Sequence, residues 1–139
     1  MDIEDINGTW KGFFTYGPDY PPEYQPIKEE FTLKLSVDNG IIFGSCVDTF
    51  TDKYFDEPAT VEGTLVDGVL SLIKKYPYFL GTDENEVVFV DRTRPSHDVH
   101  YLGRLKRKLF SESYFVEGTW NISGSYLNEN GEALYYEQD

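Results

Sequence analysis

Alternation of apolar and polar residues recurs along this chain and is longest between residues 113 and 126. One parity of that segment carries Tyr114, Val116, Gly118, Trp120, Ile122, Gly124 and Tyr126. The other parity is polar from Glu117 to Ser125. A period of two residues places the two sets on opposite faces of a β-strand. The segment is therefore predicted to be a long, half-buried strand.

The same pattern predicts further strands on both sides of this one. They cover residues 7–16, 30–37, 41–50, 59–65, 69–76, 87–90, 98–106 and 133–137. Asn39-Gly40 and Asp67-Gly68 tolerate the positive φ angles of tight turns and predict two hairpins. Residues 17–27 and 77–86 are predicted to be long loops, and the sequence NENG at 128–131 is predicted to form the last turn.

These segments predict one all-β domain over residues 1–139, with about eight or nine antiparallel strands. The favoured architecture is an up-and-down (meander) barrel, because a large twisted sheet loses its exposed edges by closing. A two-sheet sandwich with Greek-key crossings is the alternative, but it needs longer connections. The predicted inward parity holds many glycines, which let strands coil around a small barrel. They are Gly12, Gly44, Gly63, Gly103, Gly118 and Gly124.

Charge and cysteine content narrow the classes of partner. The formal net charge is −13, from 25 acidic and 12 basic residues, and this sign repels phosphate backbones and anionic lipid headgroups. We therefore expect neither nucleic acid nor a membrane as a partner. Cys46 is the single cysteine, and no basic-then-apolar segment precedes Trp10, so we expect a cytoplasmic protein.

The triplet Gly8-Thr9-Trp10 on the first strand, the inward glycines and the meander resemble the calycin group of lipocalins, fatty-acid-binding proteins and avidins. This resemblance implies that Trp10 plugs one end of the barrel. The opening GTWKGFFTYGPDYP also resembles nitrobindin-type haem barrels, which need an axial histidine late in the chain. His97 and His100 are the only histidines, and we expect no cofactor.

Asp48 and Lys74 are the most informative charges, because each continues an inward parity that is otherwise apolar or glycine. An unpaired charge inside a barrel is costly, so inward orientation requires that they pair with each other, with Tyr76 or Tyr101, or with a ligand. Three interpretations remain open. The charges reach solvent at strand ends, form a structural buried pair, or recognise a ligand at the base of an apolar cavity.

Other chemistry has weaker support in the sequence. His97 and His100 fall on opposite faces of a strand, so we predict no metal site. Cys46 has no activating neighbour, and we assign no catalytic residue. The basic residues Arg92, Arg94, Arg104, Lys106, Arg107 and Lys108 lie in one short section. They form either a solvated hairpin balanced by acidic neighbours or a docking patch for an acidic partner or an anionic ligand tail.

Together these features favour a non-enzymatic binding protein whose barrel interior holds a small, largely apolar ligand. The predicted ligand-binding residues are Trp10, Phe14, Asp48, Lys74, Tyr76, Tyr101, Tyr114 and Trp120. We also expect Trp10 and Trp120 to lie close together where the barrel closes. The alternative is an acidic protein-interaction module of immunity or adaptor type, with Tyr20 and Tyr24 as exposed loop anchors. A barrel enzyme that uses Asp48 or Tyr101 is a third possibility.

Overall fold

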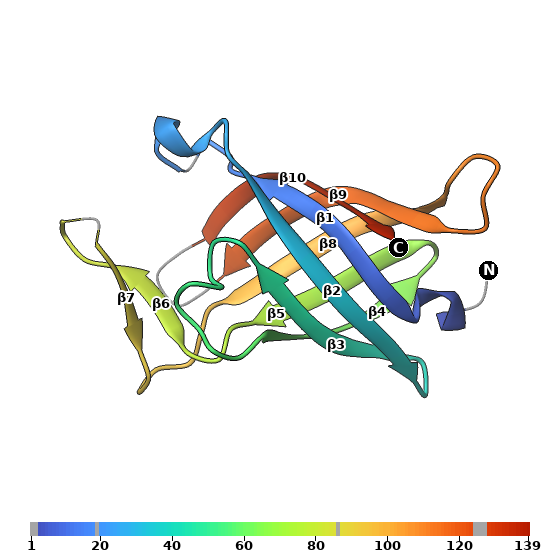
Figure 1. Cartoon of the computed structure of the whole chain (residues 1–139), viewed down its shortest axis with the longest axis horizontal. Coiled ribbons are helices and arrows are strands. Elements are labelled where there is room, and N and C mark those ends of the chain that lie inside the picture. The colour runs from blue at the N-terminus through green and yellow to red at the C-terminus, as the bar shows by residue number, and fades with distance from the viewer. Residues whose placement is uncertain (1–2, 19, 86, 124–127) are drawn as a thin grey trace.

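The computed structural model describes residues 3–18, 20–85, 87–123 and 128–139, with only the backbone described for 128–132. Eight antiparallel strands form a closed barrel in the order β1-β10-β9-β8-β5-β4-β3-β2 (Figure 1). They are β1 (Gly8–Thr15), β2 (Lys28–Asp38), β3 (Ile41–Asp48), β4 (Ala59–Val66), β5 (Val69–Lys75), β8 (Asp98–Arg107), β9 (Tyr114–Ser123) and β10 (Asn128–Gln138). The predicted all-β up-and-down barrel is confirmed, and the sandwich is excluded.

The chain leaves the barrel once, between β5 and β8. There β6 (Phe79–Thr82) and β7 (Val88–Asp91) form a separate two-stranded sheet that extends away from the barrel. The prediction of a strand at 87–90 is confirmed by β7, but its expected place in the barrel is wrong, and so is the prediction that 77–86 is only a loop. The β6–β7 hairpin packs against the segment that leads into β8. The Phe79 ring lies 4.8 Å from the His97 ring and 3.9 Å from the Arg94 guanidinium carbon.

Two boundaries also differ from the prediction. The NENG segment does not form the last turn but belongs to β10, which pairs with β9 from Asn128 onward and shifts register between Asn130 and Ala133. Such a bulge lets a strand continue through residues that favour turns. Residues 124–127, the end of the predicted strand 113–126, lie outside the described residues. The loop after β1 contains a short 3-10 helix, η2 (Pro22–Tyr24).

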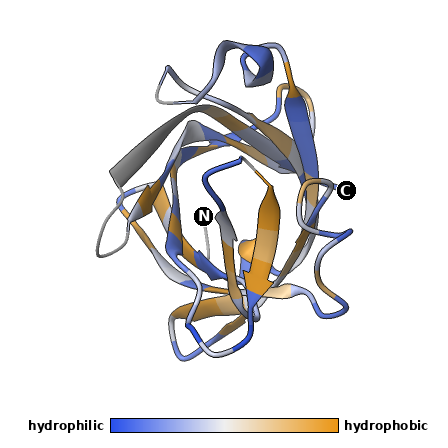
Figure 2. Ribbon diagram, turned by 90° about the vertical axis from the view of Figure 1, so that its left-hand side faces the viewer, coloured by the Kyte–Doolittle hydropathy of each residue, from blue (hydrophilic) through white to orange (hydrophobic). Residues whose placement is uncertain are grey.

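The barrel has two different ends, which we call the turn end and the loop end. The turn end carries the tight β2–β3 and β4–β5 turns, the β8–β9 hairpin and a 3-10 helix, η1 (Ile3–Ile6). The loop end carries the longer connections 16–27, 49–58 and 76–97. Figure 2 looks onto the loop end and shows the strands closing into a ring, with hydrophobic and hydrophilic residues alternating along them.

Inward glycines let the backbones of neighbouring strands approach closely. At Gly118, an added Cβ atom would overlap the carbonyl oxygen of Leu102 on β8, and at Gly12 it would overlap that of Tyr135 on β10. A side chain at either place would push neighbouring strands apart. The predicted use of glycine for barrel closure agrees with this geometry at the described positions.

The two tryptophans are both buried, but they lie at opposite ends of the barrel. Trp10 donates from Nε1 to the Ile6 carbonyl at the turn end (2.9 Å). Trp120 donates to the Thr15 carbonyl at the loop end (2.8 Å). Five residues of β1 separate these positions, about 16 Å of strand. The expectation that the two indoles lie together is wrong, because β10 lies between β1 and β9 and its register places Trp10 and Trp120 at opposite ends of the barrel.

Candidate functional site: a buried charged cluster at the loop end

Asp48 and Lys74 meet inside the barrel near the loop end. Asp48 is the last residue of β3 and Lys74 the penultimate residue of β5, and both side chains follow the inward parity of their strands. They are 2% and 1% exposed, and Lys74 Nζ lies 3.0 Å from Asp48 Oδ2. The interpretation that these charges reach solvent is therefore wrong, because the connections beyond β3 and β5 cover both strand ends.

Neighbouring hydroxyl groups complete the hydrogen bonding of this pair. Tyr76 donates its hydroxyl to Asp48 Oδ2 (2.7 Å), and Lys74 donates to the Tyr101 hydroxyl oxygen (2.7 Å). Thr51 donates to Asp48 Oδ1 from both its backbone nitrogen (2.7 Å) and its Oγ1 (2.6 Å). Both carboxylate oxygens thus accept two bonds, which is the compensation that a buried charge requires. We call these five residues the polar cluster.

The surroundings of Asp48 and Lys74 keep both side chains ionised. Burial by itself would raise the pKa of Asp48, but Lys74 and the bonds from Thr51 and Tyr76 lower it below its ordinary value. Burial would lower the pKa of Lys74, yet the surrounding phenol oxygens of Tyr101 and Tyr76, together with the Asp48 carboxylate, raise it well above its ordinary value. At neutral pH the carboxylate and the ammonium group are both ionised.

The other titratable groups here are held neutral. Burial is the main reason that the pKa values of Tyr76 and Tyr101 are raised, and burial raises the pKa of Cys46 to about 11. A general base or a thiolate nucleophile needs a pKa closer to the working pH. The chemistry that this arrangement supports is hydrogen bonding and charge recognition.

Aromatic rings surround the ammonium group of Lys74. It lies 5.4 Å from the Phe14 ring centroid, 4.9 Å from that of Tyr76 and 4.8 Å from that of Tyr101. The Phe14 ring in turn lies 5.0 Å from Trp120. Six of the eight predicted site residues are thus together at the loop end: Phe14, Asp48, Lys74, Tyr76, Tyr101 and Trp120.

The remaining two predicted site residues are elsewhere. Trp10 packs edge-on against Tyr136 at the turn end, with the ring centroids 5.7 Å apart. Tyr114 begins β9 beside the turn end and is half-buried; its backbone nitrogen donates to Gln138 Oε1 (3.1 Å). The structure therefore does not bring Trp10 or Tyr114 to the polar cluster.

Tyr20 and Tyr24 help to close the loop end instead of extending into solvent. Their ring centroids lie 4.9 and 5.3 Å from the buried Tyr16 ring, and Tyr20 also approaches Trp120 (5.8 Å). Both side chains are half-buried and pack on the core. They are part of an aromatic plug, because the proline-containing loop folds back over the barrel.

Side chains fill the described interior of the barrel. Inward apolar residues on four different strands, Trp10, Leu33, Leu72 and Tyr136, are no more than 1% exposed. The packed interior weighs against a ligand held in the middle of the barrel, and it directs attention to the access routes at the loop end.

One such route is a cleft of about 210 Å³ beneath residues 49–58. Its lining reaches from the exposed Asp56 and Glu57 to the buried Cys46 and to Tyr76. Pairing between β3 and β4 ends at Cys46 and Ala59, so the barrel wall is open beyond these residues. The Phe55 ring stacks on the Tyr76 ring in this opening, with centroids 5.6 Å apart and planes 13° apart.

Sequence reasoning missed Thr51 and Phe55. For Thr51 a signal existed, because an Asp side chain at the start of a turn often accepts a hydrogen bond from a nearby backbone N–H group. For Phe55 no local signal existed, since its position over Tyr76 depends on how the whole connection folds.

The basic residues that are close in sequence divide between the two ends. Arg92 and Arg94 stack on Tyr78 and Phe79 at the loop end, while Arg104 to Lys108 lie toward the turn end.

His100 is half-buried, and its Nε2 lies 2.9 Å from Ser123 Oγ. Within the described residues, no group of three or more His, Cys, Asp or Glu side chains is placed to hold a metal ion.

Comparisons with known proteins add no assignment. No protein-family model, curated protein or solved structure matches this chain. Among the described residues, no helix is long and apolar enough to cross a membrane.

Proposed function

We propose that this protein is a non-enzymatic binding protein that takes a small, largely apolar ligand at the loop end, in the cleft beneath residues 49–58. The observation that carries this proposal is the continuity between the cleft and the polar cluster. Tyr76 lines the cleft with its ring and donates its hydroxyl to the buried Asp48. Apolar walls with a few placed polar groups are the usual composition of ligand sites, and the resemblance to calycin barrels points to the same function.

The lining of the cleft also defines the class of ligand. Asp52, Asp56 and Glu57 surround its mouth, and Lys34 is the one basic residue in the lining. A cationic group is favoured there by charge. The stacked Phe55 and Tyr76 rings provide a flat apolar surface beneath the acidic mouth. The ligand class is therefore a small aromatic molecule with a cationic group, smaller than the drug-sized ligands that fill cavities of about 300–1,000 Å³.

Benzylamine, benzyl alcohol and benzoate are matched probes for this proposal, since they share a ring and differ in charge. We expect benzylamine to shift the backbone amide NMR signals of Thr51, Phe55 and Tyr76, with a smaller effect of benzyl alcohol and none of benzoate. Native mass spectrometry of freshly purified protein would in addition reveal a co-purified ligand.

Two variants test whether benzylamine binds in the cleft or elsewhere on the protein. Phe55→Ala removes one stacking ring and should weaken the binding of benzylamine. Tyr54→Ala removes a neighbouring half-buried ring that does not line the cleft, and it should leave the benzylamine affinity unchanged. Equal shifts by benzylamine and benzoate, or shifts confined to other parts of the barrel, would contradict the proposal.

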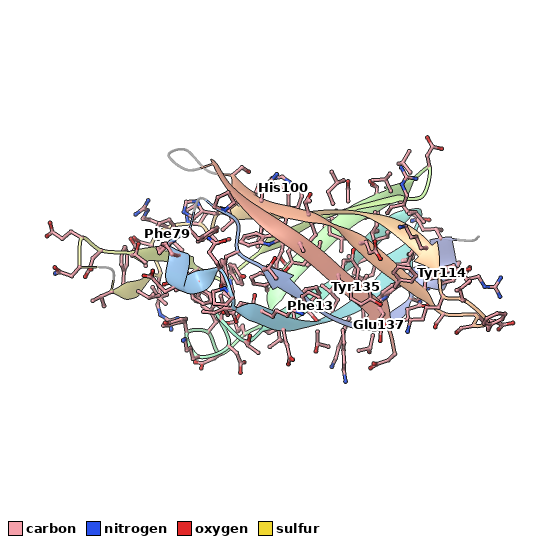
Figure 3. All side chains as sticks on the ribbon, turned by 90° about the horizontal axis from the view of Figure 1, so that it is seen from above. Phe13, Phe79, His100, Tyr114, Tyr135 and Glu137 are labelled. Atoms are coloured by element: carbon pink, nitrogen blue, oxygen red, sulfur yellow. The ribbon has the colours of Figure 1, made fainter. Side chains whose placement is uncertain are left out.

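The second candidate function is the acidic protein-interaction module. The observation that favours it is a row of aromatic side chains on the outside of the barrel, in place of Tyr20 and Tyr24. Half-buried aromatic residues form a row across the outer face of three strands: Phe13 on β1, Tyr135 on β10 and Phe115 on β9. The ring centroids are 5.9 Å apart between Phe13 and Tyr135 and 5.8 Å apart between Phe115 and Tyr135. Figure 3 shows Phe13 and Tyr135 side by side on this face, near Glu137.

A pull-down from native cells tests the second function. A protein retained by the unmodified domain should be lost with Phe13→Ala/Tyr135→Ala and kept with Phe89→Ala, since Phe89 is exposed on the separate β6–β7 sheet. If the unmodified domain retains no protein, this candidate fails.

A further inference from the structure

The β8–β9 hairpin presents two adjacent apolar side chains to solvent. Leu109 is 87% exposed and Phe110 is fully exposed. Phe110 also has a φ of 59°, a left-handed conformation that bulky residues rarely adopt. Most other large aromatic residues of the chain are at least half-buried. Packing within the barrel does not explain an exposed phenylalanine in a strained conformation, and such residues concentrate at functional sites.

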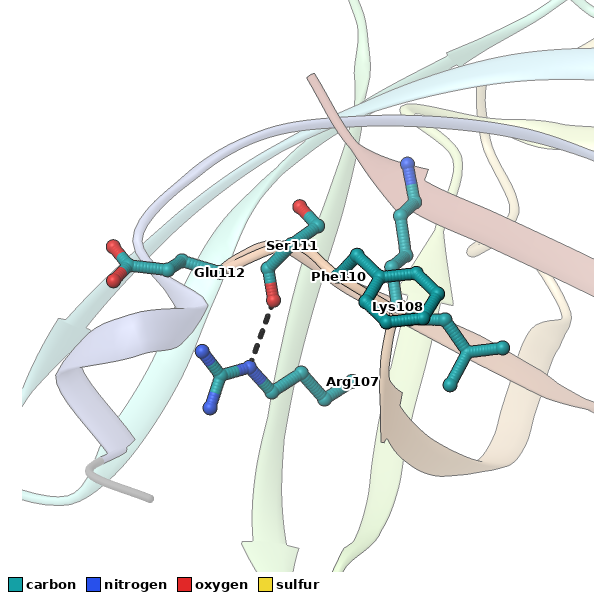
Figure 4. A pocket seen from close by; sticks show the side chains of 6 residues that line it. Arg107, Lys108, Phe110, Ser111 and Glu112 are labelled. Carbon is teal, nitrogen blue, oxygen red and sulfur yellow. Dashed lines mark hydrogen bonds between the residues drawn. The ribbon is translucent and has the colours of Figure 1, made fainter.

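Basic residues surround this apolar tip. Between residues 104 and 112, Arg104, Lys106, Arg107 and Lys108 are basic and Glu112 is the one acidic residue. Arg107 donates from Nε to the Ser111 carbonyl (2.8 Å), which holds its guanidinium group beside the loop (Figure 4). The hairpin sequence 104–112 therefore carries a net charge of opposite sign to the whole chain.

Two of these basic groups have acidic neighbours on the adjacent strands. Lys106 Nζ lies 3.5 Å from Glu117 Oε2, and Lys108 Nζ lies 3.1 Å from Glu137 Oε2. Lys106 and Glu117 are about half exposed to solvent, whereas Lys108 is half-buried at 29% exposure. Exposed ion pairs are weak, so Lys106 can exchange its carboxylate for another anionic group.

One acidic part of the surface lies far from the tip. The acidic connection 49–58 lies at the loop end, and the hairpin projects from the turn end (Figure 1). At physiological ionic strength, electrostatic interactions between exposed charges decay over about 8 Å. A surface that meets the tip therefore interacts with the charges around the hairpin, its Arg and Lys side chains together with Glu117 and Glu137, more than with the net charge of −13.

We propose that the β8–β9 hairpin docks the protein on an anionic lipid surface. Leu109 and Phe110 enter the boundary between headgroups and acyl chains, and Lys106, Arg107 and Lys108 contact the lipid phosphates. Apolar side chains flanked by lysine and arginine are the usual composition of peripheral membrane-binding segments. The lipid surface is favoured over an acidic protein because the exposed apolar tip consists of only two adjacent side chains, Leu109 and Phe110, whereas a specific protein interface buries about 800 Å² on each partner.

Vesicle co-sedimentation tests this proposal directly. The two vesicles are phosphatidylcholine alone and equal parts of phosphatidylcholine and phosphatidylserine. We expect binding to the anionic vesicles that weakens with added salt, and at least tenfold weaker binding to phosphatidylcholine alone. We further expect Leu109→Ser/Phe110→Ser and Arg107→Glu/Lys108→Glu each to reduce the anionic-vesicle affinity at least tenfold.

The matched control is Phe43→Ser/Val66→Ser, which removes two exposed apolar side chains outside the hairpin and should leave binding unchanged. Circular dichroism verifies that each variant is folded. The proposal is overturned if the protein binds neither vesicle, if it binds both equally, or if the hairpin variants bind like the unmodified protein. Loss of a specific acidic protein partner in the hairpin variants, without any vesicle binding, would establish the protein interface instead.

Discussion

The two ends of the barrel are stabilised in different ways. At the turn end, Trp10, Leu33, Leu35 and Leu70 pack as apolar side chains, and the Trp10 nitrogen finds its acceptor on η1. At the loop end, the same inward parity carries Asp48 and Lys74, whose charges depend on one another and on three hydroxyl groups. Apolar packing at the turn end tolerates substitutions between apolar side chains of similar volume. The polar cluster, in contrast, is stable only when each of its hydrogen-bonding partners is present. A site for recognition is therefore expected at the loop end.

Removing one partner of the charged pair should have the largest effect. Lys74→Met leaves the Asp48 carboxylate buried without its counter-charge, and we expect a loss of about 3–5 kcal/mol in the free energy of unfolding. Asp48→Asn/Lys74→Met removes both charges and should recover much of this loss. Chemical denaturation measures both values.

The matched control for that experiment is Lys75→Met on the same strand. Lys75 pairs with Asp98 at 3.5 Å on the surface, and an exposed pair of this kind contributes at most about 1 kcal/mol. Similar losses for Lys74→Met and Lys75→Met would show that the buried pair has no special importance.

A large apolar deletion at the turn end should cost a similar amount for a different reason. Trp10→Ala removes a fully buried indole, and we expect a loss of about 3–5 kcal/mol in the free energy of unfolding. Both indoles should also be poorly accessible to acrylamide, as measured by fluorescence quenching of Trp10 and Trp120 in the unmodified protein. Free quenching of both indoles would contradict the inward orientation of β1 and β9.

The sequence predicted the barrel well because its strands and tight turns depend on local patterns. Alternation over residues 30–37 and the Asp67-Gly68 turn each identified a strand or hairpin without reference to distant residues. The β6–β7 excursion was missed because its strands are four residues long and their pairing with each other, instead of with the barrel, is a long-range choice.

The candidate site was predicted only in part. Asp48 and Lys74 stood out because each breaks an apolar parity, and the structure confirms that both point inward. Their assembly with Thr51 depends on the conformation of the following loop. The separation of Trp10 from Trp120 depends on the register of β10 against β1 and β9, which the alternation of residues does not determine.

A smaller effect is expected in the pH dependence of stability. The folded-state pKa of Asp48 is lowered, so its contribution is present above about pH 4 and is lost as the pH falls through that lowered pKa. The folded-state pKa of Lys74 is raised, so its contribution is present below about pH 10 and is lost as the pH rises through that raised pKa.

The difference in the free energy of unfolding between the unmodified protein and Asp48→Asn/Lys74→Met should therefore stay constant across the neutral range. It should change only at the acidic and alkaline ends. Denaturation series at several pH values measure this difference, and a slope around neutral pH would contradict the assignment of both charges.

The most direct test of the buried charged cluster is NMR spectroscopy of the lysine ammonium groups at neutral pH. We predict that Lys74 gives a protonated signal whose hydrogens exchange slowly with water, because the group is buried and bonded to Asp48 and Tyr101. The exposed Lys11 and Lys75 should exchange rapidly in the same sample. An ammonium signal of Lys74 that exchanges as fast as theirs, or a neutral amine at this position, would contradict the account.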